Sequence, residues 1–185
     1  MPVQSLSGKN IAILVADGFE QIEMTSPRAA IENAGGNTAI VSLRSGQVQG
    51  WNHFDKADKF TVELLVAQAR AEDFDGLLLP GGVANPDQLR ADEAAVKFVR
   101  SFFDQHKPVA AICHAPWTLI EADAVAGRHL TSYRSIRTDL INAGANWEDK
   151  PAVTDRGLVT SRSPDDLPEF NKAMLENFAS APAAV

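Results

Sequence analysis

The amino-acid sequence predicts an α/β fold in which helices cover both faces of a mostly parallel, doubly wound β-sheet. Apolar runs such as Asn10 to Ala16, Phe74 to Leu79 and Pro108 to Ile112 are typical of strands buried on both faces. Segments with helical apolar spacing alternate with these runs along the chain, as parallel sheets require. No repeat or linker interrupts the alternation, so we expect one domain over residues 1–185 with its core at about 10–178.

The predicted strands follow the apolar runs in order. Asp17-Gly18 ends the first strand, and Pro80-Gly81-Gly82 ends the third. Between them, the segment Ser45 to Phe60 is rich in Gly, Asn, Asp and Lys, which predicts a hairpin or loop excursion. Besides the three runs above, strands are predicted at Thr38 to Leu43, His129 to Ser132, Val153-Thr154 and Leu158 to Ser161.

The predicted helices lie between these strands. Pro27 is expected to kink the first helix or to delay its start, and Gly35-Gly36 to stop it. Acidic residues in the first turn favour the last helix. Beyond that helix we expect a frayed tail from Ala179 to Val185. The helices are predicted at Glu20 to Asn33, Leu64 to Ala71, Glu93 to Gln105, Trp117 to Ala122, Ile136 to Asn142 and Asp165 to Phe178.

Composition excludes several classes of function. With 17 basic and 24 acidic residues the formal net charge is −7, so nucleic acid is not an expected partner. No apolar stretch approaches the ~20 residues of a bilayer span, and the polar N-terminus lacks the layout of a secretory signal, so we expect a cytoplasmic protein that binds no membrane. A single cysteine cannot form an internal disulfide or a Cys-based metal cluster within one subunit. We expect no metal and no cofactor.

The only cysteine, Cys113, stands where a strand meets a helix. Sites in such sheets form at the carboxyl ends of strands, and Pro116 suits the first turn of the helix that follows. This layout is that of a nucleophile elbow, and a helix N-terminus lowers a thiol pKa. The alternative is a buried cysteine that only fills core space. The amides of Gly82 and His114 could form an oxyanion hole beside the thiol, although Gly81-Gly82 could also be a simple tight turn.

Several motifs together resemble the ThiJ/PfpI family, closest to its PfpI-like intracellular protease branch. These motifs are F-E-Q-I-E (19–23), L-L-L-P-G-G (77–82), V-A-A-I-C-H-A-P (109–116), L-I-N-A-G-A (140–145) and V-T-S-R-S-P-D-D-L-P (159–168). The resemblance runs from Ile11 to about Phe178. It implies a flavodoxin-like fold of the class I glutamine amidotransferase type, with Cys113 as the nucleophile.

The resemblance also implies the other site residues. Glu20 would hydrogen-bond the cysteine sulfur, and beside a thiolate it would be protonated and act as donor; without the resemblance it reads as a solvated acid at a helix start. His114 would be the base, or only an electrostatic neighbour of the thiolate. Asp87 would orient His114 across a subunit interface, so we expect a homo-oligomer, a dimer or higher. The loop before Asp87 is one residue longer than in the family pattern, and Asp replaces the usual Glu.

Two functions from different classes follow. The first is a stress-response cysteine enzyme that acts without a cofactor on small aldehydes or early glycation adducts, as a glyoxalase or deglycase, and that could carry the label of a protease. A thiolate beside an oxyanion hole serves all of these reactions. The second is a non-catalytic redox sensor or chaperone, in which Cys113 is oxidised to sulfenic or sulfinic acid.

Overall fold

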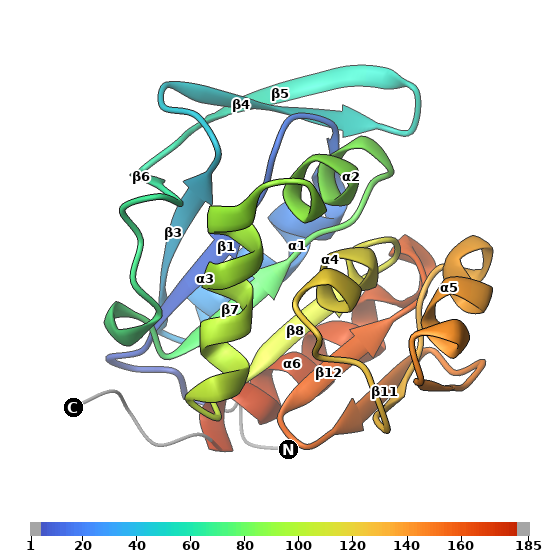
Figure 1. The fold of residues 1–185 in the computed structure, drawn as a ribbon. Coiled ribbons are helices and arrows are strands. Elements are labelled where there is room, and N and C mark those ends of the chain that lie inside the picture. The colour runs from blue at the N-terminus through green and yellow to red at the C-terminus, as the bar shows by residue number, and fades with distance from the viewer. Residues whose placement is uncertain (1–4, 181–185) are drawn as a thin grey trace.

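A seven-stranded sheet forms the centre of the fold (Figure 1). The computed structural model describes residues 5–180. All neighbouring strands pair in parallel except the first two, which form an antiparallel edge, so the predicted mostly parallel sheet is confirmed. The strand order is β11 (Ala152–Asp155), β12 (Leu158–Ser161), β8 (Val109–Ile112), β7 (Gly76–Leu79), β1 (Asn10–Leu14), β3 (Asn37–Ser42) and β6 (Leu64–Leu65).

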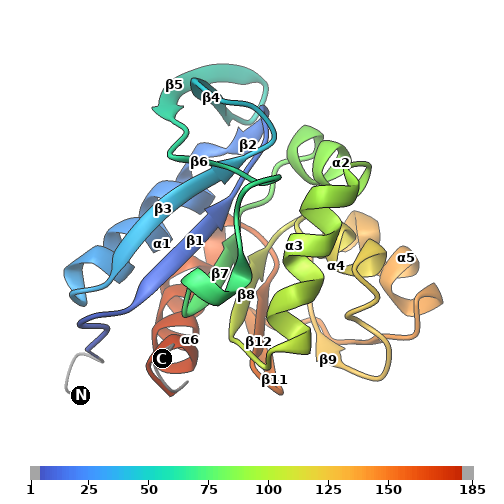
Figure 2. The ribbon, with the colours of Figure 1, turned by 60° about the vertical axis from the view of Figure 1, so that its left-hand side comes forward.

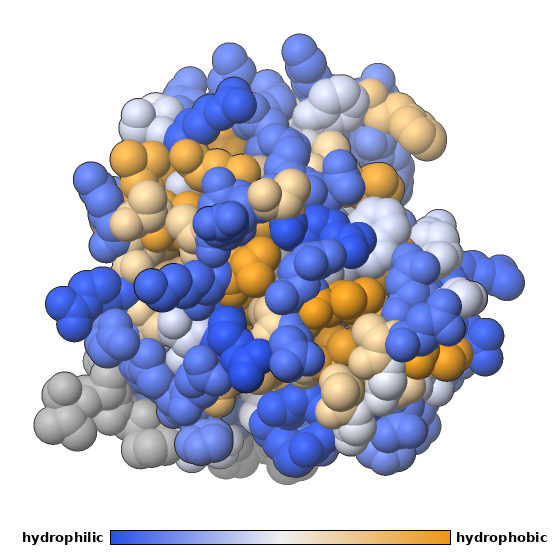
Figure 3. All heavy atoms as spheres, viewed as in Figure 1, coloured by the Kyte–Doolittle hydropathy of each residue, from blue (hydrophilic) through white to orange (hydrophobic). Residues whose placement is uncertain are grey.

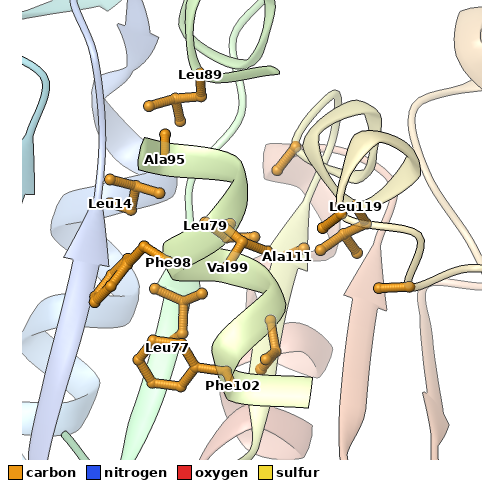
Figure 4. Close-up of a cluster of buried hydrophobic side chains, with 14 of the residues drawn as sticks. Leu14, Leu77, Leu79, Leu89, Ala95, Phe98, Val99, Phe102, Ala111 and Leu119 are labelled. Atoms are coloured by element: carbon orange, nitrogen blue, oxygen red, sulfur yellow. The ribbon is translucent and has the colours of Figure 1, made fainter. Parts of the chain in front are cut away.

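Helices cover both faces of this sheet, as Figure 2 shows from the side. α1 (Gln21–Asn33) and α6 (Leu167–Ser180) lie on one face, and α3 (Glu93–Asp104) and α4 (Pro116–Glu121) on the other. Two separate apolar clusters fill the layers, because successive side chains of a strand point to opposite faces. On β1, Ile11 and Ile13 pack toward α1 and α6, whereas Leu14 packs toward α3. Figure 4 shows the layer beneath α3, where Phe98, Val99 and Phe102 meet Leu77 and Leu79 of β7.

Smaller elements complete the edge where the strands end. β4 (Gln47–Asn52) and β5 (Asp55–Thr61) form the predicted hairpin, which pairs with β2 (Phe19–Glu20). In Figure 1 this hairpin lies over the carboxyl ends of the parallel strands, beside α2. The remaining elements are α2 (Ala84–Arg90), α5 (Arg137–Asn142), the paired strands β9 (His129–Leu130) and β10 (Asn146–Trp147), and 3-10 turns at Ala71–Asp73, Arg134–Ile136 and Pro164–Asp166.

The structure corrects parts of the prediction. The helix expected at Leu64 to Ala71 is wrong, because Leu64 and Leu65 instead pair with β3 as an edge strand and a turn follows. α1 begins at Gln21 and runs through Pro27, so the proline does not delay its start. The strand β10 and the helix α2 were not predicted. α6 extends through Ser180, beyond the start of the expected frayed tail; the rest of that tail, 181–185, lies outside the described residues. Between residues 5 and 180, no helix is long and apolar enough to cross a membrane.

Candidate active site

Cys113 occupies a strained corner between β8 and α4. Its φ is +65°, a left-handed conformation that non-glycine residues rarely adopt. Two backbone hydrogen bonds hold the corner: the amide of Cys113 donates to the carbonyl of Ser161 at 3.0 Å, and the amide of Tyr133 donates to the carbonyl of Cys113 at 2.8 Å. The predicted elbow is therefore confirmed, and the side chain is buried with 7% exposed.

The Gly81-Gly82 loop after β7 packs directly against this corner. A Cβ atom at Gly81 would lie 2.6 Å from Oε2 of Glu23 and 2.8 Å from the Cβ of Cys113, so only glycine fits. Gly82 has a φ of +80°, which also favours glycine. The backbone amides of Gly82 and His114 both hydrogen-bond the Cys113 thiol. The two donors expected from the sequence thus converge on the sulfur.

The carboxyl group beside the thiol comes from Glu23. Its side chain is fully buried on α1, lies against the Cys113 thiol, and accepts a hydrogen bond from the Gly81 amide at 2.8 Å. The expected contact between Glu20 and the sulfur is therefore a wrong assignment. Glu20 lies before the first turn of α1, and its Oε2 accepts from the amide of His53 at 3.0 Å.

The sequence itself indicated Glu23, although the resemblance led to Glu20. Met24, Pro27 and Ile31 are buried on one face of α1, and Glu23 falls on that same face. A carboxyl group within an apolar helical stripe is costly to bury unless it serves a site. The motif F-E-Q-I-E offers two acids, and helix geometry selects the second.

Burial controls the protonation of the Glu23–Cys113 pair. It raises the pKa of Glu23 to about 8, an effect that the Cys113 and Gly81 hydrogen bonds oppose and the charge of Glu20 reinforces. Burial also raises the pKa of Cys113, and the charge of Glu23 is the second cause. The hydrogen bonds from the Gly82 and His114 amides lower this pKa, but by less. The lowered thiol pKa expected from a helix N-terminus is thus wrong, because burial outweighs the hydrogen bonds from the Gly82 and His114 amides. Both shifts favour the neutral forms, so at neutral pH the carboxyl and the thiol each hold a proton, and the thiol must give its proton to a base before the sulfur can attack.

His114 extends the site on the other side of the sulfur. Its Nδ1 is 3.2 Å from Sγ of Cys113, and its Nε2 is 3.1 Å from Oγ of Ser135. The ring of Tyr133 stacks on the imidazole, with centroids 4.6 Å apart and an angle of 24° between the rings. Burial lowers the pKa of His114, so the imidazole is neutral and able to accept a proton. Sequence reasoning missed Ser135 and Tyr133, which reach the site from the segment between β9 and α5.

Asp87 does not reach the site within one chain. It is exposed in the first turn of α2, and over residues 5–180 no hydrogen bond or ion pair joins it to His114. Ser135, not an acid, is the group that contacts the far nitrogen of the imidazole. The expected contact of Asp87 with a neighbouring subunit stays a prediction.

A hollow lies next to Tyr133, although neither Cys113 nor His114 lines it. It has a volume of about 790 Å³, and its walls include Tyr133, Arg134, Arg137 and Trp147. Tyr133 belongs both to this wall and to the stack on His114. In the described part of the chain, no group of three or more His, Cys, Asp or Glu side chains is placed to hold a metal ion.

Comparisons with known proteins find relatives of this chain in both sequence and structure. The profile of the DJ-1/PfpI family matches residues 9–177. A protein of Bacillus subtilis (strain 168) named "Putative cysteine protease YraA" is 46% identical over 167 residues, which cover 90% of this chain and 96% of that protein. A two-domain Anabaena variabilis protein with DJ-1/ThiJ/PfpI-like and ferritin-like domains superposes with a TM-score of 0.87 at 32% identity, over 95% of this chain and 50% of that one. Drosophila melanogaster DJ-1beta gives a TM-score of 0.82 at 29% identity, over 94% and 91% of the two chains.

Proposed function

Because the chain belongs to the DJ-1/PfpI family, we propose that it is a cysteine enzyme acting on small carbonyl compounds or early glycation adducts, as a glyoxalase or deglycase. One observation carries the proposal. The Cys113 sulfur is surrounded by the amides of Gly82 and His114, the carboxyl group of Glu23, and the imidazole of His114 at 3.2 Å. These groups supply a nucleophile, two oxyanion donors and a proton acceptor in one place.

Methylglyoxal illustrates the chemistry. Sγ adds to the aldehyde carbon while the thiol proton passes to the His114 imidazole and then to the new oxygen, which gives a hemithioacetal. The carbon-bound hydrogen then moves as a proton to the neighbouring carbon, and the hydroxyl proton moves to the ketone oxygen, which isomerises the adduct to a lactoyl thioester. Water then cleaves the thioester to lactate and free thiol. One carbon is oxidised and its neighbour is reduced, so the reaction needs no external oxidant, reductant or cofactor.

Burial of the sulfur supports small substrates over folded proteins. Cys113 and His114 are each only 7% exposed, so a reacting carbonyl must enter a narrow space. An aldehyde or the terminal part of a glycation adduct fits that requirement. A folded polypeptide would have to unfold locally to bring a peptide carbonyl to the sulfur. The name of the Bacillus subtilis relative keeps proteolysis as the reading to be tested against this one.

The test compares methylglyoxal consumption by the wild type, Cys113→Ala and His114→Ala. We expect Cys113→Ala to fall to background and His114→Ala to lose at least ~100-fold in kcat/KM, the usual scale for a general base. His129→Ala is the matched control, because His129 is exposed and bonded to Glu148 away from the thiol. Full turnover by purified Cys113→Ala would refute the proposal. Cys113-dependent cleavage of an unfolded peptide without methylglyoxal turnover would instead establish a protease.

A second function, oxidation sensing, is favoured by the surroundings of Glu23. Its Oε1 is buried without a nitrogen or oxygen partner among the residues that the structure describes. Attack of the sulfur on hydrogen peroxide breaks the O–O bond; the thiol proton passes to the departing oxygen, which gives a sulfenic acid and water, and a second peroxide gives a sulfinic acid and a second water. A protonated Glu23 could then donate to the new oxygen. Intact-mass measurement after mild peroxide, run beside the methylglyoxal assay, separates sensing from catalysis.

A further inference from the structure

Asn85 lies at the back of the active-site loop and is completely buried. Its Nδ2 donates to the carbonyl of Pro80 at 2.8 Å and to the carbonyl of Gly81 at 3.0 Å. Its Oδ1 accepts from the amide of Ala16, just after β1, at 2.7 Å. One amide side chain therefore uses both of its donors and its acceptor to join the ends of β1 and β7.

The two carbonyls that Asn85 holds belong to the two peptide groups that serve the active site. No peptide bond among the described residues is cis, so each carbonyl oxygen points opposite to the N–H group of the next residue. The Pro80 carbonyl faces Asn85, and the Gly81 amide on the other side donates to Glu23 at 2.8 Å. The Gly81 carbonyl also faces Asn85, and the Gly82 amide on the other side points to the Cys113 sulfur.

We infer that Asn85 is a positioning residue that aims and polarises the Gly81 and Gly82 amides at Glu23 and Cys113. Fixing a carbonyl oxygen fixes the direction of the N–H group in the same peptide plane. A hydrogen bond to the carbonyl also strengthens that N–H group as a donor, because bonds in a chain polarise one another. The glycines alone cannot supply this order, since they have the greatest backbone freedom of any residue. The Glu20 amide also donates to the Gly81 carbonyl, at the longer distance of 3.4 Å, but Asn85 is the side chain that bonds both carbonyls and so supplies the rigidity that an oxyanion hole needs.

This role rests on the proposed thiol chemistry of Cys113, but it is tested without any carbonyl substrate. Asn85→Ala removes the three hydrogen bonds, and Asn85→Asp keeps the shape and the acceptor but loses the amide donors. The first measurement is the rate at which iodoacetamide alkylates Cys113 as a function of pH. The second is the proton chemical shift of the Gly81 and Gly82 amides, which reports the strength of the hydrogen bonds they donate. The third is kcat and KM for methylglyoxal, where that activity is present.

Asn177 provides the matched control. It is another buried asparagine whose Nδ2 donates to a backbone carbonyl, that of Gly157 at 2.9 Å, on α6 and away from the thiol. Asn177→Ala and Asn177→Asp thus show what loss of a buried asparagine does to the protein in general. Thermal unfolding of all four variants identifies pairs of similar stability for comparison.

We expect the Asn85 variants to change the pH profile of Cys113 alkylation and to move the Gly82 amide proton upfield, while the Asn177 variants change neither. Where methylglyoxal is turned over, kcat should fall roughly 10- to 100-fold with little change in KM, somewhat less than the loss from deleting an oxyanion donor itself. Unchanged alkylation and unchanged glycine amide shifts in a folded Asn85 variant would overturn the inference.

A wild-type measurement decides the matter if neither Asn85 variant folds. The side-chain amide protons of Asn85 should exchange slowly with solvent. They should also show scalar couplings across hydrogen bonds to the carbonyls of Pro80 and Gly81. Fast exchange without these couplings would overturn the inference, whatever the variants do. Absence of methylglyoxal turnover in the wild type, with the alkylation and amide-shift effects of the Asn85 variants present, would count against the proposed activity and not against Asn85.

Discussion

At the scale of single residues, the protonation of Glu23 sets how the protein responds to pH. Burial raises the pKa of this carboxyl from 4.5 to about 8 in the folded protein. Between these values the folded protein holds a proton that the unfolded chain has released. The folded state is then favoured by low pH, so the contribution of Glu23 to the free energy of unfolding falls as the pH rises through this window.

Glu23→Gln should remove that pH dependence. A glutamine cannot ionise, so the variant should gain stability relative to the wild type as the pH is raised from 5 to 8, by roughly 2–4 kcal/mol at about 1.4 kcal/mol per pKa unit. Urea unfolding at several pH values measures the change. Glu20→Gln is the control, because Glu20 bonds the His53 amide and not the thiol, and it should leave most of the dependence in place. The same slope in Glu23→Gln and the wild type would contradict the assignment of the raised pKa to Glu23.

The site residues differ in how well the sequence predicts them, because some owe their place to local sequence and others to contacts between distant parts of the chain. Cys113, Gly82 and the His114 amide were predictable, because each stands at a break that directly follows a buried strand. Glu23 was recoverable from helix periodicity, although the motif led to Glu20. Ser135, Tyr133 and Asn85 carry no local signal. Only the packing of separate segments brings Ser135 and Tyr133 to His114, and Asn85 to the glycine loop. Their functions depend on tertiary contacts, which periodicity does not report.

At the scale of elements, α3 shows how a short sequence signal defines a helix and its packing. Phe98, Val99 and Phe102 of α3 recur at helical spacing and fill the layer against the sheet. The side chain of Asp92 accepts a hydrogen bond from the amide of Ala95 at 2.9 Å and caps the N-terminus. The start of this helix and its buried face can therefore both be predicted from the sequence.

Asp92→Ala should destabilise the protein by about 1 kcal/mol, the usual contribution of an N-cap. The lost hydrogen bond leaves the Ala95 amide to water and removes a negative charge from the start of the helix. Asp92→Asn keeps the acceptor and should stay within a few tenths of a kcal/mol of the wild type. The midpoint of urea unfolding distinguishes them. Equal destabilisation by both substitutions would show that charge, not capping geometry, is what Asp92 contributes.

The prediction missed short strands that form only because a neighbouring strand is available to pair with them. Leucine favours helix, but Leu64 and Leu65 form a strand because the edge of β3 is available to them at Val41 and Ser42. The two residues of β10 likewise pair with β9. Such short elements are specified by a partner strand, whereas the long buried strands are specified by their own apolar composition.

At the scale of the whole molecule, apolar side chains lie exposed next to the active-site loops. Phe54 is 93% exposed, Val83 57% and Ile22 45%. Val83 follows Gly82, Ile22 precedes Glu23, and Phe54 follows the residue whose amide bonds Glu20. Over the face that carries α3, by contrast, Figure 3 shows apolar and charged residues interspersed. Exposed apolar groups near one site are typical of an interface, which supports the proposal that the protein is a homo-oligomer joined near this edge.

Such an oligomer would bring Asp87, exposed on α2 beside Val83, toward the Cys113-His114 pair of a neighbour. We therefore predict that mixing inactive Cys113→Ala subunits with Asp87→Ala subunits restores part of the activity. In a mixed oligomer, some sites combine an intact cysteine with the intact aspartate of the other subunit. Light scattering gives the oligomer size, and mass spectrometry verifies that subunits have exchanged before methylglyoxal turnover is measured.

The alternative makes the opposite prediction. If Ser135 alone orients His114, each subunit holds a complete site, and Asp87→Ala should be fully active on its own. A fully active monomer, or no recovery after verified exchange, would remove Asp87 from the site. Ser135→Ala then becomes the informative variant: it should lower kcat in either case, but only in a self-contained site should it do so without any dependence on protein concentration. The identity of the group that fixes the imidazole thus decides whether this fold acts as one chain or as an assembly.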